Sequence, residues 1–67
     1  MHLSVVVPCM NEESAIPALV DRLAAATGPW AERAEIILVD DGSTDATWEA
    51  IEAAQARVPQ VVGLRLS

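Results

Sequence analysis

The chain alternates short apolar runs with segments in which apolar residues recur at helical spacing. The apolar runs, rich in valine, isoleucine and leucine, predict β-strands at residues 3–8, 35–39 and 61–66. The periodic segments predict two helices, whose inner stripes are Ile16, Leu19, Val20 and Leu23, then Trp48, Ile51, Ala54 or Gln55, and Val58. The predicted order of elements is therefore β-α-β-α-β.

Proline and glycine set the ends of these elements. Pro8 cannot donate a ladder hydrogen bond, so we expect the first strand to stop there. Pro17 is tolerated only in the first turn of a helix, which places the start of that helix near Ser14. We expect the first helix to end at residues 27–29, Thr-Gly-Pro, and the second to end at Pro59.

Strands that are apolar on both faces and separated by helices predict a parallel sheet with right-handed crossovers. If each crossover steps in the same direction, the strand order is 3-2-1 and both helices cover one face. The other face of the strands that hold Val5, Val7, Ile37 and Val39 is then bare. A parallel sheet needs cover on both faces, so we expect residues 1–67 to be the amino-terminal half of an α/β domain.

The composition also favours an incomplete domain. Of only 67 residues, 52% are hydrophobic, which is more apolar material than so short a chain hides well. We therefore expect either self-association through the uncovered sheet face or a place for this chain within a larger domain.

The charge balance argues against two classes of partner. Ten acidic residues against four arginines and no lysine give a net charge of −6, so little would neutralise the phosphates of nucleic acid or anionic lipid. Cys9 is the only cysteine, which leaves no internal disulfide, and no cysteine–histidine cluster has zinc spacing. With no signal peptide and no apolar stretch long enough to span a membrane, we expect a cytoplasmic chain.

Two polar loops follow adjacent strands of the predicted sheet. They read PCMNEE at residues 8–13 and DDGSTD at residues 40–45, and the carboxyl ends of parallel strands share one edge. Their carboxylates suit ribose hydroxyls, base N–H groups or a cation, and they repel bare phosphate. The chain contains no glycine-rich phosphate-binding motif. We expect both Asp40 and Asp41 to be hydrated at the mouth of this crevice.

Each loop also has a purely structural interpretation. Gly42 suits a turn with positive φ, and one of residues 43–45 could cap the following helix. Asn11, Glu12 and Glu13 could simply place acids at the positive, amino-terminal end of the helix that follows them. Neither interpretation explains two adjacent acids directly after a buried strand.

We expect Cys9 to be a small buried thiol rather than a nucleophile, because no basic residue lies near it in the sequence.

The motif SVVVPCMNEE at residues 4–13, followed by EIILVDDGSTDAT at residues 35–47, resembles the amino-terminal, nucleotide-binding part of the family 2 glycosyltransferases with the GT-A fold. The likeness is greatest to the dolichol- or polyprenyl-phosphate glycosyltransferase branch, and VVGLRLS at residues 61–67 is similar to the third strand there. The resemblance covers essentially the whole chain. It implies the three-stranded parallel half of a GT-A, Rossmann-like nucleotide-binding domain.

The resemblance also implies which residues contact a nucleoside diphosphate sugar. The implied contacts with its base and ribose come from Pro8, Met10, Glu12, Val39 and Asp41. Asp40 would support the site by orienting the loop. Met10 departs from the family, which commonly has tyrosine there; a thioether still packs against a base, but the aromatic stack is lost.

The activity implied by the resemblance is transfer of a sugar from a nucleoside diphosphate sugar to a lipid phosphate or another acceptor. The family's D-x-D pair, which holds Mg²⁺ or Mn²⁺ against the diphosphate, is not among the 67 residues. We therefore expect this fragment alone to bind no metal and to be inactive, and we assign it no catalytic residue. A full-length relative would work at the cytoplasmic face of a membrane.

Two other functions are open at this point. The motif ILVDDG after a strand also resembles the acidic pocket of a receiver domain in signalling. The third predicted strand, however, ends LRLS without the acid of such a domain, and the chain has no lysine. The second alternative is a non-enzymatic α/β module whose bare sheet face is an association surface.

Overall fold

A computed structural model describes residues 2–66. Its strands and helices follow the predicted order, with one 3₁₀ helix added before the second strand. The elements are β1 (Leu3–Cys9), α1 (Ile16–Ala26), η1 (Gly28–Arg33), β2 (Ala34–Asp41), α2 (Thr47–Arg57) and β3 (Val61–Leu66). Both helices end at the predicted stops, before Thr27 and before Pro59.

The strands of the described chain form one parallel sheet in the order β1-β2-β3. This is the predicted order 3-2-1 counted from the opposite edge. The register aligns Val6 with Ile37 and Ile37 with Val62, so the apolar residues form continuous rows across the sheet. The prediction of a three-stranded parallel α/β unit is confirmed.

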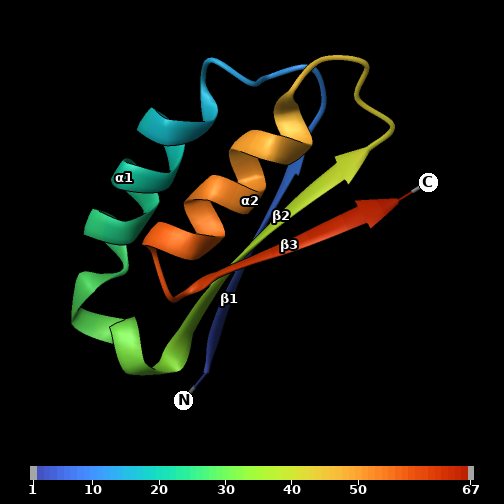
Figure 1. Ribbon diagram of the computed structural model, residues 1–67. Helices are drawn as coiled ribbons and strands as arrows, with labels where there is room; N and C mark the ends of the chain where they lie inside the picture. Colours follow the sequence, from blue (N-terminus) through green and yellow to red (C-terminus); the bar gives the residue numbers. More distant parts are fainter. Residues whose placement is uncertain (1, 67) are drawn as a thin grey trace.

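Both helices pack on the same face of the sheet (Figure 1). Side chains of a strand alternate between its two faces, and one set from each strand enters the core beneath the helices. Val5 and Val7 are half-buried on this side. The core consists of Cys9, Ile16, Val20, Ile36, Leu38, Ile51, Ala54, Val58 and Val61.

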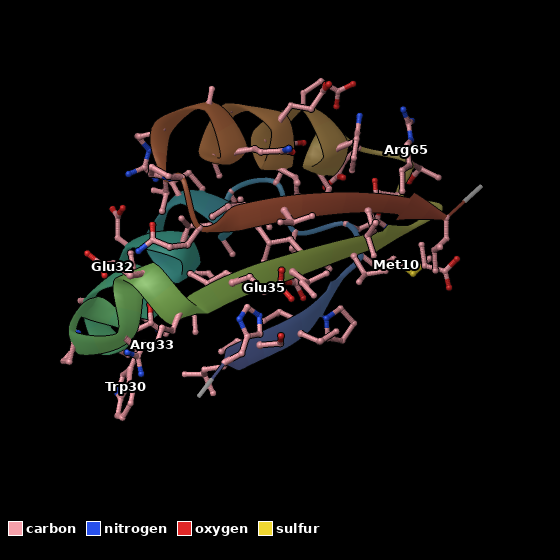
Figure 2. All side chains as sticks on the ribbon, turned by 90° about the horizontal axis from the view of Figure 1, so that it is seen from below. Met10, Trp30, Glu32, Arg33, Glu35 and Arg65 are labelled. Atoms are coloured by element: carbon pink, nitrogen blue, oxygen red, sulfur yellow. The ribbon has the colours of Figure 1, made fainter. Side chains whose placement is uncertain are left out.

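The opposite face of the sheet carries no helix of residues 2–66, as expected (Figures 1 and 2). Val6, Leu64 and Leu66 expose 61%, 47% and 52% of their surfaces. We call this apolar surface the uncovered face; it consists of Val6, Pro8, Ile37, Val39, Val62, Leu64 and Leu66. A polar group borders it at the amino end, where the Ser4 hydroxyl donates to a carboxylate oxygen of Glu35 over 2.8 Å.

The second strand is longer than predicted. It runs to Asp41, so Asp40 and Asp41 continue the strand instead of opening the loop. In the register they align with Arg65 and Leu66 of β3. Strand pairing uses backbone groups alone, so a charged side chain does not end it.

The first helix begins later than predicted. The backbone carbonyl of Glu12 accepts hydrogen bonds from the N–H groups of Ala15 and Ile16, which forms a turn before the helix. Ser14 lies within this turn, and Ala15 at the N-cap position provides no side-chain cap. Pro17 lies in the first turn of α1, as predicted.

Candidate functional site

The β1–α1 and β2–α2 loops lie side by side at the carboxyl edge of the sheet (Figure 1). The backbone N–H of Asn11 donates to Oγ of Ser43 over 3.0 Å, and the N–H of Thr44 donates to Oδ1 of Asn11 over 2.9 Å. The hydroxyl of Thr44 donates to the same oxygen over 3.3 Å. The two polar loops predicted to share one edge are therefore in direct contact.

Two more side chains of the β2–α2 segment accept hydrogen bonds from the β1–α1 loop. The buried hydroxyl of Thr47 accepts the N–H of Glu12 over 2.8 Å and donates to Oδ1 of Asp45. Oδ2 of Asp45 accepts the N–H of Glu13 over 3.4 Å. With the N–H of Asn11, consecutive backbone donors ahead of α1 are thus engaged within the protein. Backbone donors ahead of a helix bind phosphate in many other α/β folds, but the N–H groups of residues 11–13 already have partners within the protein.

The acidic pair divides between the two faces of the sheet. Asp40 is 1% exposed, and its Oδ1 accepts the backbone N–H of Ser43 over 3.0 Å. The expectation that Asp40 is hydrated is wrong, because the alternation of strand side chains turns it toward the helices. Asp41 comes next in the strand, points to the opposite side and is exposed. Of the two acids, Asp41 is the one whose carboxylate is open to a ligand.

The residues expected to contact a nucleotide gather at this edge. Pro8 and Val39 are aligned neighbours on the uncovered face, and Asp41 follows Val39 on that face. Met10, which is 56% exposed, and Glu12, also exposed, come from the adjoining loop. Figure 2 shows Met10 at this end of the molecule. Their contacts with a nucleotide stay predictions.

Two groups near the loops have shifted pKa values. The hydrogen bond from the Thr47 hydroxyl is the largest cause that holds the pKa of Asp45 below its ordinary value. Burial, the next largest, opposes it, and backbone N–H groups lower the pKa further. Burial raises the pKa of the Cys9 thiol, and the charges of Glu12 and Asp40 raise it further. Cys9 is fully buried, as predicted, and it is poorly suited to act as a nucleophile.

Arg65 brings a positive charge to the end of the sheet that holds the acidic loops. The guanidinium carbon of Arg65 is 5.5 Å from the ring centre of Trp48, and the residue lies at the same end of the sheet as Met10 (Figure 2). The opposite end holds a surface hollow of about 370 Å³ formed by η1 and lined by Pro29, Trp30, Glu32 and Arg33. That hollow is remote from both loops and contains none of the residues expected to contact a nucleotide.

The residues that join the two loops were not predicted from the sequence. Asn11 has a left-handed backbone with φ of 53°, a conformation that asparagine tolerates better than most residues. The signal available in the sequence was an asparagine directly before Glu12 and Glu13. The capping interpretation is wrong in its strict form, because α2 has Ala46 at its N-cap position and no side-chain cap; Asp45, one residue earlier, accepts the backbone N–H of Thr47 at Oδ1 over 3.0 Å.

The family description "Glycosyl transferase family 2" matches residues 4–67. The chain belongs to glycosyl transferase family 2. The dodecaprenyl-phosphate galacturonate synthase of Rhizobium johnstonii is 57% identical to this family 2 chain over 47 residues, which cover 70% of the chain and 14% of that protein. The undecaprenyl-phosphate 4-deoxy-4-formamido-L-arabinose transferase of Aeromonas hydrophila is 42% identical over 66 residues, or 97% of the chain and 20% of that protein.

A crystal structure of S. aureus TarS, residues 1–349, has the same fold over this length. It superposes with a TM-score of 0.80 and 33% identity, covering 100% of this family 2 chain and 19% of the TarS chain. The predicted family and GT-A fold are confirmed, and the receiver-domain alternative has no support. The chain spans a fifth or less of the length of these curated relatives. None of the helices in residues 2–66 combines the length and apolar character needed to cross a membrane.

Proposed function

We propose that this chain is the nucleoside-binding part of a glycosyltransferase that moves a sugar from a nucleoside diphosphate sugar to a polyprenyl phosphate. The observation that carries the proposal is the outward carboxylate of Asp41, beside the Pro8–Val39 pair on an open sheet edge of a family 2 chain. Relatives named for dodecaprenyl and undecaprenyl phosphate support this class of acceptor.

The chemistry of the edge fits a nucleoside better than a phosphate. The Asp41 carboxylate accepts hydrogen bonds from ribose hydroxyls or from base N–H groups. Pro8, Val39 and the exposed thioether of Met10 offer apolar surface to the base. Glu12 and Asp41 both repel phosphate, so the diphosphate would extend away from them.

The metal expected in the whole enzyme does not fit the residues of this chain. Within residues 2–66, no group of three histidine, cysteine or acidic side chains is placed to hold an ion. Asp40 is buried and accepts the Ser43 N–H, which leaves Asp41 as a single open carboxylate of the pair. An Mg²⁺ or Mn²⁺ ion that bound the diphosphate would need additional ligands, and we assign no step to it.

Calorimetric titration of the chain with uridine and guanosine diphosphates tests the site. We expect saturable binding of one of them, and an affinity about five- to twentyfold weaker in Asp41→Ala, because a hydrogen bond to a charged group contributes about 1.5–3 kcal/mol in favourable cases and less when exposed. Glu52→Ala is the matched control, since Glu52 is an exposed acid on α2. Equal binding by the wild type and Asp41→Ala would reject the assigned role of Asp41.

A sugar-transfer assay addresses catalysis by the same chain. We propose that the chain alone does not transfer sugar. We also propose that it lies in the cytoplasm, where nucleotide sugars are donors and a single thiol such as that of Cys9 stays reduced. Incubation with nucleotide sugars, polyprenyl phosphate and Mn²⁺ should give no glycolipid by mass spectrometry. Turnover would show that the chain supplies more of the catalytic machinery than we assign to it.

We also propose that the isolated chain associates weakly with itself through the uncovered face. Three strands spaced about 4.8 Å apart, each rising about 3.3 Å per residue, present on the order of 300 Å² to a partner. This is well below the roughly 800 Å² per partner of a standard stable interface, so we expect weak association rather than a permanent dimer. Sedimentation velocity should show mass increasing with concentration in the wild type and a monomer in Leu64→Lys. A monomer at every wild-type concentration would reject the proposal.

A further inference from the structure

Asn11 both donates and accepts hydrogen bonds across the junction of the two loops. Its backbone N–H donates to Oγ of Ser43 over 3.0 Å, while its Oδ1 accepts the N–H of Thr44 over 2.9 Å. The Thr44 hydroxyl supplies a further donor to the same oxygen at 3.3 Å. A single residue of the β1–α1 loop therefore holds two consecutive residues of the β2–α2 loop.

The bridge continues into the core. Ser43, which accepts from Asn11, donates its own N–H to the buried carboxylate of Asp40 over 3.0 Å. Asp41 lies between Asp40 and Ser43 in the chain, and both of these neighbours are fixed by the bridge. On the other loop, Asn11 lies directly beside Met10 in the sequence. The bridge thus fixes the loop that follows Asp41 against the β1–α1 loop, while Asp41 itself is the last residue of β2.

The backbone at Asn11 restricts which residue can build this bridge. Its φ of 53° lies in the left-handed region, where glycine, asparagine and aspartate are the residues best tolerated. Glycine would fit the backbone but has no acceptor for Thr44. Aspartate keeps the acceptor oxygen but adds a charge to loops that already hold Glu12 and Asp45. Asparagine meets both the backbone and the acceptor requirement without another charge.

We propose that Asn11 is a positioning residue of the nucleoside site: through Ser43 and Thr44 it holds the loop that follows Asp41 in place against the loop that contains Met10. This inference rests on the proposed function, because positioning has meaning only if a nucleoside binds at this edge. Asn11 itself is not assigned a contact with the ligand.

Three variants of the chain separate the backbone from the side chain. Asn11→Gly keeps the left-handed backbone and removes the acceptor, and Asn11→Asp restores the acceptor. Ser43→Ala removes only the hydroxyl that accepts the Asn11 N–H. This variant tests the bridge if Asn11→Gly does not fold. Glu52→Ala, an exposed change on α2, is the control. Each is titrated with uncharged uridine and guanosine and with their diphosphates, by NMR.

We expect Asn11→Gly to bind the nucleoside about tenfold more weakly and Ser43→Ala about fivefold more weakly, as loss of one or two hydrogen bonds predicts. The Thr44 amide should exchange with solvent about tenfold faster in Asn11→Gly. Asn11→Asp should recover Thr44 protection and the affinity for the uncharged nucleoside to within about threefold, which a general loss of stability would not produce.

Wild-type affinity in a folded Asn11→Gly or Ser43→Ala variant would overturn the inference, as would failure of Asn11→Asp to restore nucleoside binding. If the wild type binds neither nucleosides nor diphosphates, the proposed function fails, and the bridge is judged from the amide shifts of Asp41 and Gly42. Unchanged shifts of these two amides in Asn11→Gly would show that Asn11 does not position the loop, whatever the ligand.

Discussion

A methyl group added at Gly63 tests how closely α2 is seated on β3. A Cβ at this position would lie 2.8 Å from Cγ2 of Ile51, 3.1 Å from Oε1 of Gln55 and 3.2 Å from Cη2 of Trp48. Favourable contacts between carbon atoms lie at about 3.5–4.0 Å. Gln55 is exposed and can move aside, but Ile51 is fully buried. We therefore expect Gly63→Ala to push α2 away from the sheet.

The size of the effect follows from two opposing contributions. Forcing an extra methyl group into a packed core costs about 1–3 kcal/mol. Alanine in a strand is favoured over glycine by roughly 0.5–1 kcal/mol, because glycine loses more backbone entropy on folding. Taking the middle of each range, we expect the free energy of unfolding to fall by about 1–2 kcal/mol. For a domain of this size, this corresponds to a melting temperature lower by roughly 5–15 °C.

Thermal and urea unfolding, followed by far-UV circular dichroism at low protein concentration, measure this change. Gly28→Ala is the matched control, because a Cβ there meets no atom within 4 Å; we expect it to be neutral or stabilising by up to about 1 kcal/mol. Ile51→Leu removes the Cγ2 branch at nearly constant volume and should recover part of the stability lost in Gly63→Ala. Equal stability of Gly63→Ala and the wild type would refute the close seating of α2.

Three more predictions concern the loops. The pKa of Asp45 is lowered in the folded chain, so its carboxylate contributes stability above about pH 3.9 that is lost as the pH falls through the folded-state pKa. The urea midpoint of Asp45→Asn should therefore lie below that of the wild type at pH 7 and meet it in acid. A constant difference between the two midpoints at all pH values would contradict this. The raised pKa of Cys9 predicts slow alkylation of the native chain by iodoacetamide at pH 8. Alkylation should be faster in Asp40→Asn and fastest in urea, because burial is the largest cause of the raised pKa. Rapid alkylation of the native wild type would refute the prediction. Gly42 has φ of 80° with open space at its Cβ position, so Gly42→Ala should cost about 1–2 kcal/mol from backbone strain alone and Gly42→Asn less, as urea unfolding would show.

The fold was predictable because each element has a strong local signal. Runs such as residues 35–39 and 61–66 are too short for helices, and Pro59 ends the helical segment before β3. The prediction that Pro8 ends the first strand is wrong by one residue, because β1 runs to Cys9. The end of β2 was not predictable from the same signal. Asp40 and Asp41 interrupt the apolar pattern, yet their backbones continue the pairing with β3. Hydropathy reports which side chains are buried, whereas strand length depends on backbone pairing with a neighbour.

The candidate site was predictable in part. Placing both polar loops at carboxyl ends of adjacent parallel strands was enough to bring Met10 and Asp41 to one edge. The bridge through Asn11 was not predictable, because its partners Ser43 and Thr44 lie 32 and 33 residues further along the chain. Serine, threonine and asparagine form local caps and turns at least as often as distant contacts, so their types alone do not identify the partner.

The two adjacent acids at the end of β2 have different environments because a strand turns successive side chains to opposite faces. Asp40 is enclosed under the helices, where an unpaired carboxylate is costly, and the N–H of Ser43 is the partner that offsets this cost. Asp41 meets solvent and the uncovered face. The first acid therefore shapes the loop that follows the second, and the second is left free to bind. Exchanging their roles would require a one-residue shift of β2 against β1 and β3, which would also turn Ile36 and Leu38 out of the core.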